Sequence, residues 1–139
     1  MIFIWAMGCT MPIKIDVQLP FTADQVWVVL GTPDRVDWVP GVESCSLKDG
    51  VRSLVLPGAG AIKERILNLD HSLKKIEYSC FESPGPLESH YSSIQVLEAK
   101  EGCRLLWEAS VEPIAIETFV RASMQGALAQ LKIILTLGD

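Results

Sequence analysis

The spacing of apolar side chains changes along the chain from a repeat of two to a helical repeat, and this change constrains the fold most strongly. From Val42 to Glu112, apolar and polar residues alternate, as they do in strands with one buried face. Turn-forming pairs such as Asp49-Gly50 interrupt the alternation often enough to separate six strands. The predicted strands are residues 42–48, 51–56, 61–69, 74–81, 90–98 and 104–112. The short breaks make consecutive strands antiparallel neighbours.

Helical signals lie on both sides of this strand-rich stretch. In residues 12–19, apolar and polar side chains alternate, which predicts a first strand. Thr22 and Gln25 then have the spacing of a capping box, which predicts the start of a short helix. Thr32-Pro33 begins a second short helix, with a hydroxyl at the cap and proline at the first helical position. After Pro113, apolar residues recur at helical spacing for about 20 residues, which predicts one long C-terminal helix.

This order of elements predicts an α+β domain. A seven-stranded antiparallel sheet curves around the long C-terminal helix, and two short helices follow the first strand. One helix cannot fill the inside of such a sheet, so we expect a cavity between them. We interpret residues 12–139 as a single domain, and residues 1–11 as an N-terminal extension or a segment before an alternative start at Met11.

Charge and cysteine usage narrow the classes of function. Twelve Lys and Arg oppose 17 Asp and Glu, a net charge of -5, which disfavours nucleic-acid binding. No apolar run reaches the roughly 18 residues of a membrane span, so we expect no membrane insertion. The four cysteines have no metal-ligand spacing, and we interpret them as reduced thiols of a cytoplasmic protein. We expect neither a metal nor another cofactor.

Several short motifs resemble one known family in their order and spacing. They are Val26-Trp27, the run from Trp38 to Cys45, Val51-Arg52, Glu64-Arg65, Asp70, Tyr78, the run from Ser83 to Leu87, Tyr91 and Leu106-Trp107. Together they resemble the polyketide cyclase/dehydrase and lipid-transport family of the START-like, or birch-pollen-allergen-like, superfamily. The resemblance implies a helix-grip fold with an apolar cavity. Leu56-Pro57 and Leu87 also resemble loops of the plant abscisic acid receptors, but Glu43 stands where those receptors place a carboxylate-anchoring lysine.

The family resemblance also implies which side chains face the cavity. The implied ligand-binding residues are Glu43, Arg52, Leu54, Leu56, Ile62, Glu64, Tyr78, Cys80, Tyr91, Ser93, Glu108, Phe119, Ser123 and Ala127. For the strand at 90–98, alternation leaves the opposite face open as an alternative, because Ser92, Ile94 and Val96 are more apolar than Tyr91 and Ser93. We also expect residues 38–42, 57–60 and 83–87 to form loops at one mouth of the cavity.

Charged residues aimed at an apolar space are costly unless they are paired. Arg52 and Glu64 therefore form a structural ion pair across neighbouring strands, or Glu64 serves a ligand directly. In the second interpretation, Glu64 or Glu108 acts as a base while Tyr78 or Tyr91 polarises a carbonyl.

Three functions remain open from the sequence. The leading hypothesis is a module that binds or transports an apolar small molecule, such as a lipid, polyketide or aromatic metabolite. The second is an enzyme of the cyclase or dehydratase kind that acts on a polyketide-like substrate. The third is an interaction protein whose outer apolar residues Leu105, Trp107 and Ala109 form a homodimer surface.

Overall fold

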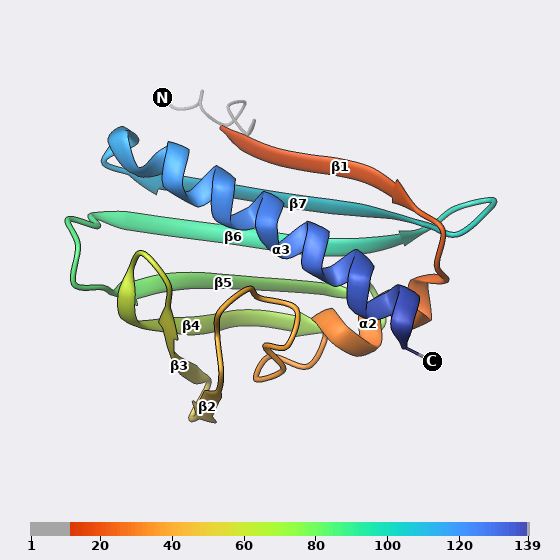
Figure 1. The fold of residues 1–139 in the computed structure, drawn as a ribbon, viewed down its shortest axis with the longest axis horizontal. Helices are drawn as coiled ribbons and strands as arrows, with labels where there is room; N and C mark the ends of the chain where they lie inside the picture. The colour runs from red at the N-terminus through yellow and green to blue at the C-terminus, as the bar shows by residue number, and fades with distance from the viewer. Residues whose placement is uncertain (1–11, 139) are drawn as a thin grey trace.

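The computed structural model describes residues 12–138, and its strands form one antiparallel sheet in the order β1-β7-β6-β5-β4-β3-β2 (Figure 1). The seven strands are β1 (Ile13–Leu19), β2 (Cys45–Lys48), β3 (Val51–Leu56), β4 (Gly60–Asp70), β5 (Lys75–Glu82), β6 (Ser89–Glu98) and β7 (Cys103–Glu112). From β2 to β7 every strand pairs with the next in sequence, and β1 closes onto β7. The prediction of a seven-stranded antiparallel sheet is confirmed.

Within residues 12–138, three helical segments accompany the sheet. The short helix α2 (Ala23–Leu30) begins with the predicted capping box, in which the Thr22 hydroxyl accepts from the Gln25 amide and the Gln25 side chain accepts from the Thr22 amide. A single 3-10 turn, η1 (Ile114–Ile116), leads into the long helix α3 (Glu117–Leu137). Figure 1 shows α3 lying across one face of the sheet.

The predicted second short helix does not form. Residues 32–42 instead fold as a series of turns held by hydrogen bonds between residues three apart, such as Arg35 to Thr32 and Val39 to Val36. Pro33 and Pro40 explain the difference, because only six residues separate them and the residue before a proline is pushed out of helical geometry. The stretch is too short for a helix with continuous hydrogen bonding.

The core lies between the inner face of the sheet and the helices. Leu105 of β7 and Leu131 of α3 are both 0% exposed, and Trp107 packs against Trp38 with ring centroids 5.5 Å apart. Full burial of a leucine side chain contributes about 1.5–3 kcal/mol. The prediction that Leu105, Trp107 and Ala109 form an outer homodimer surface is therefore wrong, because all three side chains are buried in the core of one chain.

Some predictions fall outside these observations. Residues 1–11, including the N-terminal extension and Cys9, lie outside the described residues, and the domain boundary at residue 12 stays a prediction. Cys45, Cys80 and Cys103 are free thiols. The cytoplasmic location stays a prediction, as does the expectation of no nucleic-acid partner. Within residues 12–138, no helix is both long enough and apolar enough to span a bilayer.

Candidate functional site

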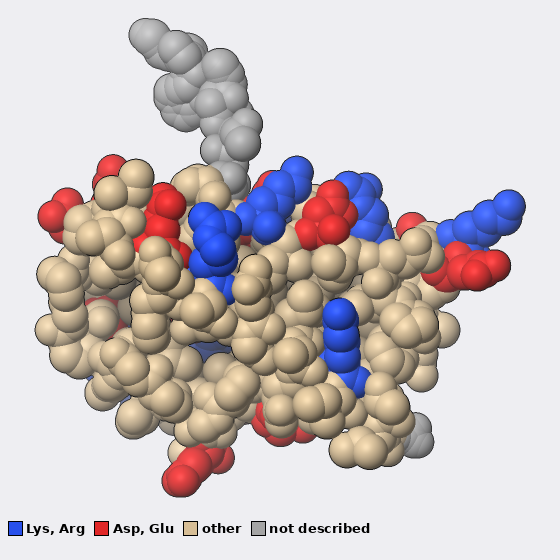
Figure 2. All heavy atoms as spheres, turned by 45° about the horizontal axis from the view of Figure 1, so that its top comes forward, with Lys and Arg blue, Asp and Glu red and all other residues tan. Residues whose placement is uncertain are grey.

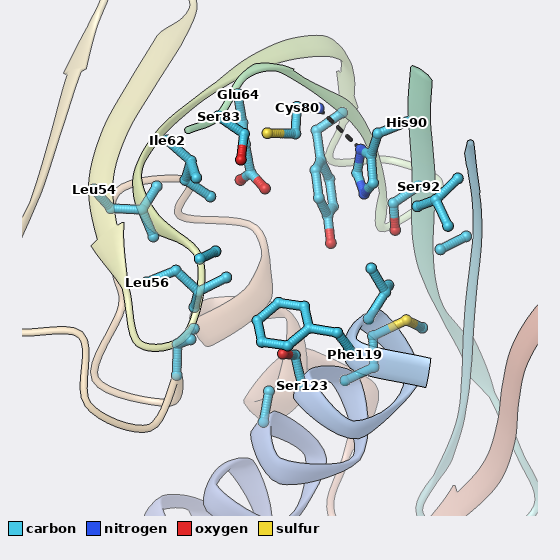
Figure 3. A pocket seen from close by; sticks show the side chains of 18 of the residues that line it. Leu54, Leu56, Ile62, Glu64, Cys80, Ser83, His90, Ser92, Phe119 and Ser123 are labelled. Atoms are coloured by element: carbon cyan, nitrogen blue, oxygen red, sulfur yellow. Dashed lines mark hydrogen bonds between the residues drawn. The ribbon is translucent and has the colours of Figure 1, made fainter. Parts of the chain in front are cut away.

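A cavity of about 440 Å³ separates α3 from the inner face of the sheet. Figure 3 shows its walls: Leu54, Leu56 and Ile62 on one side, Glu64, Cys80 and His90 along the sheet, and Phe119 and Ser123 on α3 opposite. In Figure 2, charged side chains gather along one edge of the molecule, while most of the face shown is uncharged and is hollowed. The cavity therefore offers a mainly apolar environment with a few polar groups on the sheet.

Three loops meet at the mouth of the cavity. Gly41 approaches Pro57 so closely that an added Cβ would lie 2.5 Å from the proline Cγ, and a Cβ at Gly60 would lie 3.0 Å from Cγ of Pro84. A Cβ at Gly58 would lie 2.7 Å from the ring of Phe119, so the loop also touches α3. These contacts bring residues 38–42, 57–60 and 83–87 together, as the sequence predicted. Glycine is required where the loops approach this closely.

Arg52 and Glu64 form a buried ion pair on neighbouring strands. They are direct partners in the register of β3 and β4, and Arg52 Nε lies 2.7 Å from Glu64 Oε1. Their side chains are only 13% and 14% exposed. Arg52 Nη1 also donates to the Pro33 carbonyl at 2.8 Å, and the guanidinium lies 4.6 Å from the centre of the Tyr78 ring. Burial favours the neutral arginine, but the Glu64 carboxylate, Tyr78 and Cys45 together outweigh burial and raise the pKa of Arg52.

The two neighbouring groups on β5 are held in their protonated forms. Burial, with a smaller contribution from the Glu64 charge, raises the pKa of Tyr78. The same two causes raise the pKa of the Cys80 thiol to about 11. A thiol with that pKa is a poor nucleophile at neutral pH, since the thiolate is the reactive form. Cys80 therefore serves as a cavity wall.

His90 on β6 is a polar cavity residue that the sequence analysis did not select. Its Nδ1 accepts a hydrogen bond of 2.9 Å from the backbone N–H of Cys80, drawn as the dashed line in Figure 3. Its ring lies 5.9 Å from that of Tyr78. Burial lowers the pKa of His90. Its position on the same face as Ser92, Ile94 and Val96 was the available signal, since alternate residues of a strand share a face.

Ser92 and Trp107 supply a polar pair that is already satisfied. Trp107 Nε1 donates to Ser92 Oγ at 3.1 Å, and Ser92 Oγ donates to the Glu108 carbonyl at 2.9 Å. Ser92 is 1% exposed and is the one polar side chain among the fully buried ones of the described chain. These bonds tie β6 to β7 and fix the wall behind the cavity.

Ten of the fourteen implied ligand-binding residues border the cavity. They are Arg52, Leu54, Leu56, Ile62, Glu64, Tyr78, Cys80, Phe119, Ser123 and Ala127. From α3, Val120 and Met124 border it as well. Glu43 is exposed in the segment before β2 and does not border the cavity.

The facing implied for Tyr91, Ser93 and Glu108 is wrong, because all three lie on the opposite face of the sheet. Tyr91 donates a hydrogen bond of 2.5 Å to Glu77 on the outer face. Burial, and then this hydrogen bond, raise the pKa of Tyr91 to about 12. Glu108 lies 3.9 Å from Lys14 of β1. The inward positions of β6 and β7 belong to the more apolar alternate residues, since burial of that face against α3 is favourable. Two of the four candidate catalytic residues, Glu64 and Tyr78, therefore remain at the cavity.

Solved structures with the same fold include a bacterial protein, a plant enzyme and the protein Ara h 8.0201. A protein from Bacillus thuringiensis is 25% identical, with a TM-score of 0.78 over 88% of this chain and 97% of that one. Norcoclaurine synthase from Thalictrum flavum, in complex with dopamine and hydroxybenzaldehyde, is 15% identical, with a TM-score of 0.69 over 91% of this chain and 87% of that one. Ara h 8.0201 is 12% identical, with a TM-score of 0.73 over 90% and 97%.

A search of curated proteins gives no match. The model of one family, described as polyketide cyclase/dehydrase and lipid transport, matches residues 12–135, which is nearly the whole described chain. The helix-grip arrangement of sheet, cavity and long helix agrees with that match. The chain therefore belongs to the polyketide cyclase/dehydrase and lipid-transport family.

Proposed function

We propose that the protein binds an apolar small molecule in the cavity between the sheet and α3. The observation that carries this proposal is the cavity itself: about 440 Å³, within the range of about 300–1,000 Å³ typical of small-molecule sites. Leu54, Leu56 and Ile62 form one wall, and Phe119 of α3 faces them (Figure 3). Transfer of an apolar ligand from water into an apolar cavity of this kind is favourable.

The state of the polar groups supports binding over chemistry. Glu64 is paired with Arg52, and the pKa of Cys80 is raised to about 11. A thiol with that pKa stays protonated near neutral pH and cannot act as a general base, and the Glu64 carboxylate already accepts a hydrogen bond from Arg52 Nε. Tyr91 and Glu108, the alternative candidates of the enzyme hypothesis, lie outside the cavity, which leaves Glu64 and Tyr78 as its candidates. The proposed role is therefore to carry or present a molecule.

The test is a titration with N-phenyl-1-naphthylamine, a neutral apolar dye whose fluorescence rises in apolar surroundings. We expect saturable binding of one dye per chain. Ser123→Phe places a ring into the cavity and should weaken binding at least tenfold, whereas Gln125→Phe, on the exposed side of the same helix, should leave it unchanged. Absence of saturable binding, or equal binding by the two variants, would contradict the proposal.

Native mass spectrometry of the protein purified from its own source would identify the bound molecule. We expect a co-purifying mass that is present in the native complex and is released on denaturation. The same measurement on Ser123→Phe should lose that mass. Retention of the mass by this variant would place the molecule elsewhere on the protein.

A further inference from the structure

One hydrogen-bond donor on the cavity wall has no protein partner. His90 has two ring nitrogens, and Nδ1 is already used, because it accepts the backbone N–H of Cys80 at 2.9 Å. A nitrogen that accepts cannot carry the proton of a neutral imidazole, so the proton is on Nε2. The main chain of β5 thereby fixes both the orientation of the ring and its tautomer.

The second nitrogen faces open space. Within residues 12–138, every buried side-chain nitrogen or oxygen has a hydrogen-bond partner, and no protein group bonds to Nε2 of His90. Nε2 therefore borders open space, and His90 borders the cavity (Figure 3). Burial lowers the pKa of His90, which keeps the ring neutral near pH 7. The wall thus presents an N–H donor without a positive charge.

Two arginines border the cavity, and a carboxylate of the protein already holds each of them: Asp37 accepts from Arg35 Nε and Nη2, and Glu64 accepts from Arg52. At the buried ion pair, Glu64 accepts a hydrogen bond from Arg52 Nε, and the Pro33 carbonyl accepts one from Arg52 Nη1. A ligand carboxylate would meet the Glu64 charge and a guanidinium that is already neutralised. Transfer of such an anion out of water without a partner is strongly unfavourable. A neutral acceptor such as a ketone oxygen needs only one donor.

From this geometry we infer that His90 is a specificity-determining residue, whose Nε2–H donates to a carbonyl oxygen of an uncharged, otherwise apolar ligand. This inference rests on the proposed function, because it assumes that the cavity takes a small molecule. It adds the chemical class of that molecule: a neutral ketone or related carbonyl compound, in preference to a hydrocarbon or a carboxylate of the same size.

Three naphthalene derivatives of matched size test the inference: 2-acetylnaphthalene, 2-ethylnaphthalene and 2-naphthoate. Their affinities are measured at pH 7.5 by displacement of N-phenyl-1-naphthylamine. We expect the ketone to bind about three- to tenfold more tightly than the ethyl compound, the range of one net hydrogen bond. The carboxylate should bind more weakly than the ketone.

Two substitutions at His90 separate its two nitrogens. His90→Asn keeps an acceptor for the Cys80 N–H but has no group that reaches as far as Nε2, so the preference for the ketone should fall to about onefold. His90→Gln carries an amide N–H near the place of Nε2 and should restore part of the preference. Tyr91→Phe, the adjacent residue on the outer face, should keep the full preference.

A measurement on the unmodified protein covers the case in which His90→Asn does not fold. In nitrogen-15 NMR, the resonance of the His90 Nε2–H should move on addition of 2-acetylnaphthalene and stay in place with 2-ethylnaphthalene. A stationary resonance, or equal affinities for the two compounds, would overturn the inference while leaving the proposed function intact. If the dye binds but none of the three compounds displaces it, the inference also fails, whereas absence of saturable dye binding would contradict the proposed function itself.

Discussion

Removal of the Glu64 charge is the sharpest test of the buried ion pair. Glu64→Gln keeps the side-chain volume but leaves the Arg52 guanidinium, 13% exposed, without its carboxylate. Breaking a buried pair from one side typically costs about 3–5 kcal/mol. Arg52 keeps the Pro33 carbonyl and the Tyr78 ring, and the adjoining cavity admits water. We therefore expect a loss of about 2–3 kcal/mol in the free energy of unfolding.

The assay is urea unfolding with a matched surface pair as control. Arg104 Nη2 lies 2.6 Å from Asp16 Oδ2, but these side chains are 50% and 34% exposed, so Asp16→Asn should cost less than about 1 kcal/mol. The double variant Arg52→Met with Glu64→Leu should recover most of the stability, since apolar replacement of a whole buried pair is often neutral.

The refuting results are distinct. Equal small losses for Glu64→Gln and Asp16→Asn would show that the cavity exposes the Arg52 pair to water, so that its burial contributes little. Unchanged stability together with lost binding of N-phenyl-1-naphthylamine would show that Glu64 contacts the ligand directly. Either result would refute the interpretation of Arg52 and Glu64 as a structural pair.

Three further predictions follow from single groups. Ala127→Leu should weaken dye binding at least tenfold and change the unfolding free energy by less than about 1 kcal/mol, because the new side chain extends into the cavity. The control is Ala129→Leu, at an exposed position of the same helix. A loss of about 1–3 kcal/mol with unchanged dye binding would show instead that Ala127 lies in a packed wall. Burial lowers the pKa of His90 in the folded state, so the unfolded state binds the proton first as the pH falls. The free energy of unfolding, measured with urea, should therefore fall as the pH drops below 6.5, and should fall less steeply in His90→Asn. An equal dependence of this free energy on pH in the two proteins would refute the prediction. Cys80, with its pKa raised to about 11, should stay unmodified by iodoacetamide at pH 8 in the folded protein and react after denaturation, as peptide mass spectrometry would show; rapid native labelling would contradict the burial.

Hydrophobic spacing alone determined the elements that build the fold. The alternation in residues 42–112 predicted the strands with their antiparallel order, and the helical stripe after Pro113 predicted α3. Local chemistry also sufficed at Thr22 and Gln25, because a capping box involves only residues close in sequence. The Arg52 and Glu64 pair could be predicted as one of two alternatives, since an unpaired charge on an inward face is too costly.

Tertiary structure decided which face of each strand meets the cavity and which polar groups remain free there. Alternation defines two faces of β6 and β7 but does not say which one α3 covers, and the resemblance placed Tyr91, Ser93 and Glu108 on the wrong one. His90 escaped the sequence analysis for a related reason: its tautomer and its free nitrogen depend on the backbone N–H of Cys80, which β5 brings alongside from ten residues away. Contacts between strands and helix set such features, and a single strand's sequence does not contain them.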